Sequence, residues 1–171
     1  MENNILVVGV IGLDSVRNAR GSVQKVVGGS GAYAALSASY FGKTYLMSVV
    51  GQDFTAAHMA PFKKRKVDMQ GVQNAPGKTF FWEASYDKDF KNAFTEVTDL
   101  NVLHGFKPKV LPAHKDAQAV FLANIDPLMQ LDVIKQLGPQ KRIITCDTMN
   151  YWIESNLSAV KKVIKKQTYF L

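Results

Sequence analysis

A strand-like run that ends in two glycines and leads into an alanine-rich helix is the feature that most constrains this fold. Val26 and Val27 end the run, Gly28 and Gly29 follow, and Ser30 opens the segment SGAYAALSASYF. Glycine reaches backbone dihedrals that side chains forbid and leaves the main chain open to a ligand. Ser30 is a typical N-cap, and the free N–H groups of the first helical turn point back at the glycines. The junction therefore predicts either a site for an anion or a row of hydroxyls, or a tightly packed turn.

Alternation of apolar runs with helical segments predicts an α/β fold with a mostly parallel sheet. Short, β-branched runs of the kind found in buried strands occur at 5–11, 45–50, 119–125 and 142–146. Helical patterns occur at 30–41, 56–66, 127–137 and 157–166. Gly42 is a plausible stop for the first of these helices, and Pro61 a kink or a late start for the second. The segment 67–72 is short and turn-like, and another apolar run begins at Thr168.

Two segments interrupt the alternation and predict a separate β-rich lid. Residues 16–27 are polar at first and resemble a hairpin or loop, and residues 78–102 contain KTFFWEASY, a charged turn and a second strand-like stretch. Aromatic and β-branched residues at this density favour a strand. If that strand is regular, Phe80, Trp82 and Tyr86 share one face. Such a face can stack on a ligand, meet the lid of a partner or simply pack.

Composition indicates one globular domain spanning residues 1–171, with 47% hydrophobic and 20% charged residues. No apolar run is long enough to cross a bilayer, the N-terminus lacks a signal-peptide pattern, and the single Cys146 allows no internal disulfide. We therefore expect a cytoplasmic protein without a membrane partner. The net charge of +7 is concentrated at 63–66 and 161–166 without a nucleic-acid motif, so we expect solvated basic faces and no nucleic-acid partner.

Several other site chemistries find little support in the sequence. His58, His104 and His114 lie in separate segments without metal-ligand spacing, so no metal site is expected. There is no GxSxG motif for a nucleophilic triad. The loop GGSGAY differs from GxGxxG and lacks the lysine of a P-loop, which argues against dinucleotide binding.

Five segments, in order along the chain, resemble the signatures of the ribokinase-like (pfkB-type) carbohydrate kinases. They are GVIGLD at 9–14, the glycine turn and helix at 26–36, VVGQDF at 49–54, ANIDP at 123–127 and DTMNYW at 147–152. The last two resemble a subgroup that acts on sugars or nucleosides. One departure is Ala57, which stands where the third segment of the family ends in glycine. The resemblance covers essentially the whole chain and implies a Rossmann-like (ribokinase-like) sheet with a small β-sheet lid over the sugar.

The resemblance also implies a set of substrate-binding residues. These are Asp14, Gly28, Gly29, Ser30, Tyr33, Asn124 and Asp126, with Phe80 and Trp82 from the lid. Further candidates are Asp53, Asp147 and Asn150. Tyr33 stands where family members commonly have Asn, which implies a ligand with a base or a larger group, or a lost contact. From the residues alone, Asp14 could equally be a turn aspartate at the end of the first strand.

The function implied is ATP-dependent phosphorylation of a sugar or nucleoside hydroxyl, with ATP and Mg²⁺ as cofactors and a homodimer formed through the lid. The family's magnesium-linked NxxE segment and its GAGD motif, which holds the catalytic aspartate, do not occur in this sequence. No catalytic residue is therefore assigned, and most of the ATP site is expected to be missing. We expect the N-terminal part of a kinase without the C-terminal half of the fold, from a truncated reading frame or fragment, that is inactive alone. The alternatives are a non-catalytic sugar-binding or dimerisation module derived from such a kinase, and a different Rossmann-like enzyme.

Overall fold

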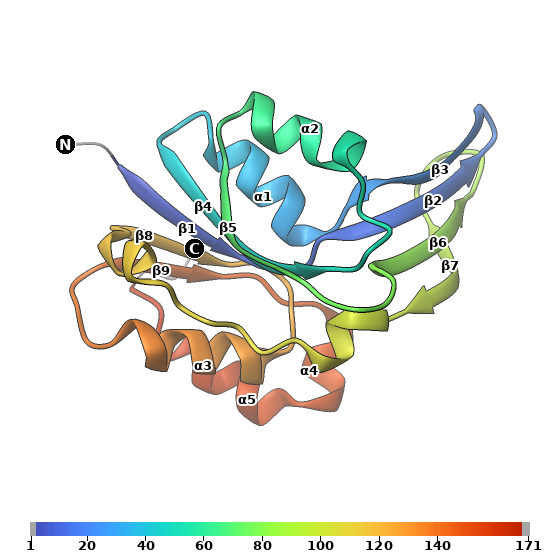
Figure 1. Ribbon diagram of the computed structural model, residues 1–171. Helices are drawn as coiled ribbons and strands as arrows, with labels where there is room; N and C mark the ends of the chain where they lie inside the picture. The colour runs from blue at the N-terminus through green and yellow to red at the C-terminus, as the bar shows by residue number, and fades with distance from the viewer. Residues whose placement is uncertain (1–2, 169–171) are drawn as a thin grey trace.

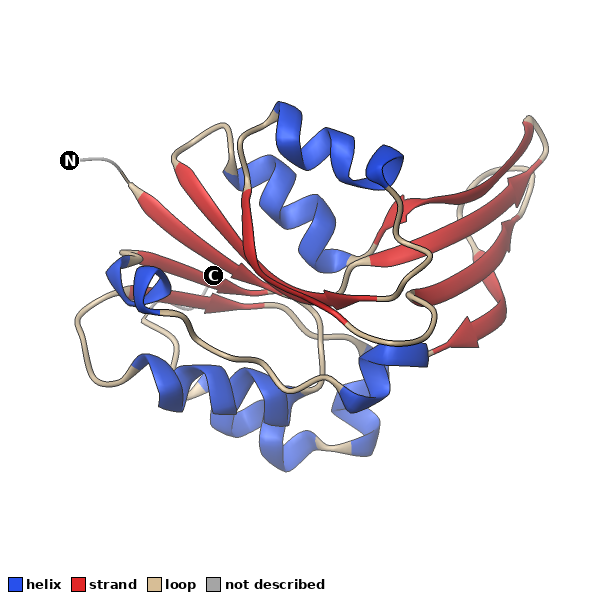
Figure 2. Ribbon diagram, in the orientation of Figure 1, coloured by secondary structure: helices blue, strands red, loops and turns tan. Residues whose placement is uncertain are grey.

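The structure, a computed structural model that describes residues 3–168, places a parallel sheet between two layers of helices (Figure 1). A second, smaller sheet projects from one end of this body, on the right in Figure 2. We call it the lid sheet. The predicted α/β architecture with a small additional sheet is confirmed. Of the apolar run predicted from Thr168 onward, all but the first residue lies outside the described part.

The central sheet has five strands in the order β5-β4-β1-β8-β9, and all its neighbours are parallel. The strands are β1 (Asn4–Val8), β4 (Lys43–Val50), β5 (Asp68–Asn74), β8 (Ala119–Leu122) and β9 (Ile143–Cys146). β1 lies in the middle, and its Leu6, Val7 and Val8 are fully buried because helices cover both faces.

Two strand predictions need correction. The run predicted as one strand over 5–11 ends at Val8, where Gly9 lies so close to Gly31 and Ala123 that a side chain would collide. Residues 68–72 of the segment 67–72, predicted as turn-like, belong to β5. β5 is an edge strand, so its sequence DMQGVQN does not need the apolar character of a buried strand.

Helices α1 (Ser30–Ala38) and α2 (Ala56–Lys64) cover one face of the central sheet, above it in Figure 1. α3 (Pro127–Leu137), the short α4 (Asn150–Ser155) and α5 (Leu157–Ile164) lie on the other face. Each face carries its own cluster of buried apolar side chains. α1 lies on the connection between the parallel strands β1 and β4 and leads directly into β4, whereas two strands of the lid sheet lie between β1 and α1.

The ends of α1 differ from the prediction. The N-cap residue is Gly29 and not Ser30, and no side chain caps the helix. The helix ends at Ala38, so Gly42 is not its stop. A side chain at Gly42 would overlap the carbonyl oxygen of Asn3, so this glycine permits a close approach to β1.

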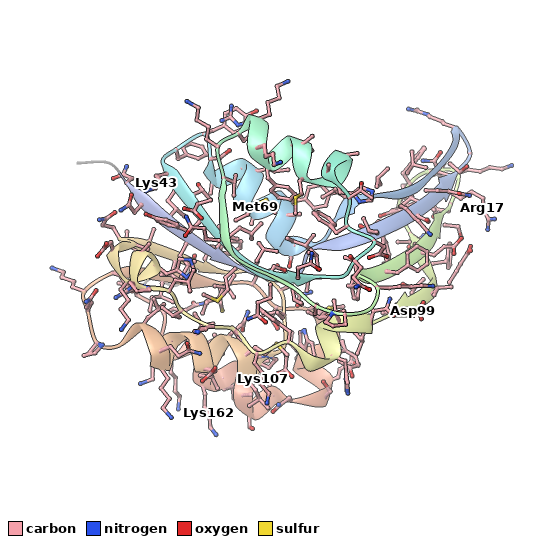
Figure 3. The ribbon with its side chains drawn as sticks, in the orientation of Figure 1. Arg17, Lys43, Met69, Asp99, Lys107 and Lys162 are labelled. Atoms are coloured by element: carbon pink, nitrogen blue, oxygen red, sulfur yellow. The ribbon has the colours of Figure 1, made fainter. Side chains whose placement is uncertain are left out.

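The lid sheet contains β2 (Gly12–Asn18), β3 (Gly21–Gly28), β6 (Phe80–Tyr86) and β7 (Ala93–Asp99) in the order β3-β2-β6-β7. β2 pairs antiparallel with β3 and parallel with β6, and β6 and β7 form an antiparallel pair. Arg17, labelled in Figure 3, lies on the lid sheet and pairs with Glu96 at 2.8 Å across it. A long connection with two 3-10 turns, η1 (Asn101–Gly105) and η2 (Pro112–Asp116), leads back to β8.

The basic segment of α5 is a solvent-facing surface. Lys161 and Lys162 are exposed, whereas Val160 and Val163 of the same helix are buried. Figure 3 shows Lys162 pointing outward from the helical layer. Within residues 3–168, no helix combines the length and the apolar character that crossing a bilayer requires.

Candidate functional site

A cavity of about 690 Å³ opens between the lid sheet and the carboxyl ends of β1, β8 and β9. In open α/β sheets, ligands bind beyond the carboxyl ends of the strands. Its walls come from the lid sheet, from η1 and the residues before it, and from the segments that follow the three strands. The lining residues are Val10, Asp14, Gly29, Phe80, Trp82, Thr95, Thr98, Leu100, Leu103, His104, Asn124, Ile125, Asp126, Met129, Met149, Tyr151 and Trp152.

Asp14 lies inside β2 rather than at the end of β1, and glycines make room for its carboxylate. A side chain on Gly28 would overlap this carboxylate, and one on Gly12 would come within 3.3 Å of it. Within residues 3–168, no hydrogen bond or ion pair reaches the carboxylate. Burial raises the pKa of Asp14 to about 6, because partial removal from water disfavours the charged form.

The glycine turn is used mainly to join α1 to the loop after β1. The backbone N–H groups of Gly31 and Ala32 both donate to the carbonyl oxygen of Val10, so neither is free to bind an anion. Gly29 has φ of +91°, a conformation that favours glycine, and a side chain there would collide with the same oxygen. The Ser30 hydroxyl accepts from Val10 N and donates to the Asn124 carbonyl oxygen at 2.8 Å. Of the two alternatives that the sequence left open for this junction, these N–H groups therefore match the tightly packed turn and not the anion site.

Asn124 presents an unpaired acceptor. Its Nδ2 donates to Met149 Sδ at 3.1 Å, while its Oδ1 is buried and has no partner among the described residues. Asp126 is the N-cap of α3, and its Oδ1 accepts from Leu128 N at 2.8 Å. Both residues follow β8 and line the cavity. A ligand with hydroxyl donors would satisfy Asn124 Oδ1, which otherwise stays buried at a cost.

Six predicted site residues line this cavity: Asp14, Gly29, Phe80, Trp82, Asn124 and Asp126. Their role in binding stays a prediction. Gly28 and Ser30 do not line the cavity but contact residues that do. Gly28 leaves room for the Asp14 carboxylate, and the Ser30 hydroxyl donates to the Asn124 carbonyl oxygen.

Four predicted residues lie elsewhere. Tyr33 is 62% exposed and outside the cavity wall, as are the exposed Asp147 and Asn150. Asp53 accepts from both the N–H and the hydroxyl of Thr79 at 2.7 Å. Since that hydroxyl also accepts from Gly51 N, Asp53 joins the end of β4 to the start of β6.

Sequence reasoning missed a large part of the wall. Tyr151 and Trp152 belong to α4, and Leu103 and His104 to η1. A signal for the two aromatic residues was present, because DTMNYW directly follows a predicted strand and ends in them. No comparable signal marks η1.

The described wall of the cavity offers no assembled cluster of metal ligands and no lysine or arginine for the phosphates of ATP. Among the described residues, no group of three or more His, Cys, Asp or Glu side chains could hold a metal ion. The wall residues of the cavity include two carboxylates but no lysine or arginine to contact phosphate. We therefore assign no step of phosphoryl transfer to these residues.

The strand order, the lid sheet and the position of the cavity define the ribokinase-like class of α/β fold. Solved structures with this fold include ribokinase from Giardia lamblia, with a TM-score of 0.77 and 17% identity over 95% of this chain. A nucleoside kinase from Methanocaldococcus jannaschii, an archaeal member of the ribokinase family, has a TM-score of 0.74 and 20% identity over 96% of this chain. Arabidopsis thaliana ribokinase, solved with ribose and ATP, has a TM-score of 0.69 and 16% identity over 86% of this chain.

The chain corresponds to little more than half of each of these structures: 56%, 58% and 54% of their lengths, in the same order. At such identities the likeness establishes the fold. No protein-family profile matches the sequence, and no curated protein sequence matches it.

Proposed function

We propose that this chain is the substrate-binding part of an ATP-dependent kinase that phosphorylates a hydroxyl group of a sugar or a nucleoside. The observation that carries the proposal is a pair of unpaired acceptors in one cavity, the Asp14 carboxylate and Asn124 Oδ1. Buried acceptors without donors are costly, and ligand hydroxyls are the donors that match them. The ribokinase-like fold supports the same chemistry.

In this proposal, Asp14 accepts hydrogen bonds from substrate hydroxyls, and Asn124 Oδ1 accepts from another. Phe80 and Trp82 cover the bound ring from the lid sheet. ATP as the phosphoryl donor is supported by the similar ribokinase that was solved with ribose and ATP. The catalytic base and the ligands of Mg²⁺ are not assigned to residues of this chain.

A non-catalytic binding or dimerisation module is the second candidate. It is favoured by the cavity wall, which among the described residues has no lysine or arginine for phosphate. Either candidate is compatible with a homodimer formed through the lid sheet. Turnover of a bound ligand with ATP and Mg²⁺ distinguishes a kinase from a module.

Calorimetric titration tests the proposal. We expect ribose or a ribonucleoside to bind at pH 7.5, and Asp14→Asn to weaken that binding about 10- to 100-fold, as expected for the loss of a charged hydrogen-bond acceptor. Asp116→Asn, at an exposed position in η2, is the matched control and should bind like the wild type. Equal affinity of Asp14→Asn and wild type, or no binding of either ligand, would contradict the proposal.

A further inference from the structure

Both tryptophans of the chain line the same cavity. Trp82 comes from β6 of the lid sheet, and Trp152 comes from α4, the helix that follows β9. Phe80 and Tyr151 add a second ring to each of these two walls. Aromatic walls of this kind bind flat, apolar ring systems by stacking.

Each tryptophan ring is held by a neighbour. Trp82 Nε1 donates to the hydroxyl of Thr95 on β7 at 3.2 Å. The ring of Trp152 packs edge-on against Tyr151, with centroids 4.8 Å apart and an interplanar angle of 75°. Rings that are fixed before a ligand arrives lose less conformational entropy on binding.

The polar groups of the cavity lie next to these aromatic walls. Asp14 and Trp82 are register partners of β2 and β6, so their side chains lie on one face of the lid sheet. Asn124 contacts Met149, and the carbonyl oxygen of Met149 accepts from Trp152 N. Each unpaired acceptor is therefore connected to one of the two tryptophans.

Most of the remaining wall is apolar, although Thr95, Thr98, His104 and Asp126 also line it, and this limits the ligands that fit. A free sugar carries hydroxyls on all sides, and those facing the six aliphatic or thioether residues Val10, Leu100, Leu103, Ile125, Met129 and Met149 would lose water without gaining a partner. The volume of about 690 Å³ is in the range of pockets for larger, drug-sized ligands, roughly 300–1,000 Å³. The cavity thus suits a ligand that is hydroxylated at one end and flat and apolar at the other.

We propose that the ligand is a ribonucleoside with an uncharged base, in which the ribose hydroxyls meet Asp14 and Asn124 and the base lies against Trp152 and Trp82. The proposal rests on the proposed function for the role of the hydroxyl acceptors. Recognition of the base rests on the aromatic walls. Phosphorylation of a sugar hydroxyl would not require these walls. Trp152 is the residue that distinguishes base binding from hydroxyl binding. It lies on α4, whereas Trp82 is the register partner of Asp14 in the lid sheet.

The test compares adenosine with ribose by calorimetry and by tryptophan fluorescence at pH 7.5. We expect adenosine to quench the fluorescence and to bind at least about tenfold more tightly than ribose. Trp152→Leu should weaken adenosine binding about 5- to 100-fold and change ribose binding less than about twofold, since only the base loses its stacking partner. Trp152→Phe should retain most of the adenosine affinity. Tyr40→Leu, at a position 72% exposed and outside the cavity, is the control and should change the affinity for neither ligand.

The outcomes separate the two proposals. Ribose binding as tightly as adenosine, with both affinities unchanged by Trp152→Leu, overturns the nucleoside proposal and leaves the proposed function standing. Adenosine binding that depends on Trp152 but not on Asp14 overturns the hydroxyl-binding role and supports the aromatic walls. Binding of neither ligand overturns both. If thermal unfolding shows that Trp152→Leu is unfolded, Trp82→Leu in the lid sheet repeats the comparison on the other wall.

Discussion

At the scale of single residues, the ionised carboxylate of Asp14 carries a cost in the folded chain that a ligand with hydroxyl donors would offset. Its carboxylate is partly buried, has no partner among residues 3–168 and has a pKa raised from 3.8 to about 6. Between these two values the folded chain holds more protons at Asp14 than the unfolded chain. The stability contributed by this residue therefore falls as the pH rises from about 4 to about 6, and stays low above it.

We predict that Asp14→Asn stabilises the ligand-free chain at neutral pH while weakening ligand binding. The amide removes the buried charge, so the unfolding midpoint of the variant should exceed that of the wild type above pH 6, and the difference should shrink toward pH 4. Thermal unfolding measured across this range checks the prediction. A difference independent of pH, or a variant less stable at pH 7.5, would show that the Asp14 carboxylate does not destabilise the fold.

At the scale of elements, Gln130 of α3 holds the carboxyl ends of β8 and β9 together. Its Nε2 lies 3.1 Å from three carbonyl oxygens, those of Leu122, Ala123 and Asp147. The side chain is 2% exposed, so these carbonyls have little access to water. The two strand ends lead directly to Asn124 and Met149, which line the cavity.

We predict that Gln130→Met destabilises the chain by about 1–3 kcal/mol, because the methionine is similar in length but cannot donate to the buried carbonyls. Urea unfolding measures the change. Gln52→Met, at an exposed loop position, is the control and should lie within about 0.5 kcal/mol of the wild type. A Gln130→Met variant as stable as this control would mean that the carbonyls find other partners.

At the scale of the whole molecule, the lid sheet has two edge strands, β3 and β7, and part of its apolar surface is exposed. β3 is an edge strand of this sheet, and its Val23 and Val26 are 50% and 40% exposed. Val26 is the register partner of Asp14, so this surface continues the face of the sheet that lines the cavity. Exposed edges and apolar faces favour pairing with another chain.

We predict that two copies of the chain associate through the lid sheet. Val23→Lys should shift the chain toward the monomer, because a charge at the edge strand opposes pairing. Leu128→Lys, which replaces a 56% exposed residue on α3, should leave the association unchanged. Sedimentation velocity distinguishes the two results. A wild-type chain that stays monomeric as its concentration is raised would refute the lid dimer.

Local sequence patterns predicted much of the fold because they act over a few residues. Pro127 to Leu137 forms a helix within the predicted bounds, begun by an aspartate cap and a first-turn proline. KTFFWEASY contains β6 as predicted. β5 was missed because an edge strand can be polar, and α4 because a helix of six residues gives no periodic signal.

The sequence by itself determined most of the strands and helices in their order, the glycine turn and a short set of polar candidates, since periodicity and turn chemistry are local properties. Only the tertiary structure decided which candidates share a cavity. The register of the lid sheet aligns Val26, Asp14, Trp82 and Thr98 in one row, and the parallel order of β1, β8 and β9 brings Trp152 to the same opening. Register and strand order depend on contacts between residues far apart in the chain, so no local pattern could place Tyr33 and Asp147 outside the cavity wall and Trp152 within it.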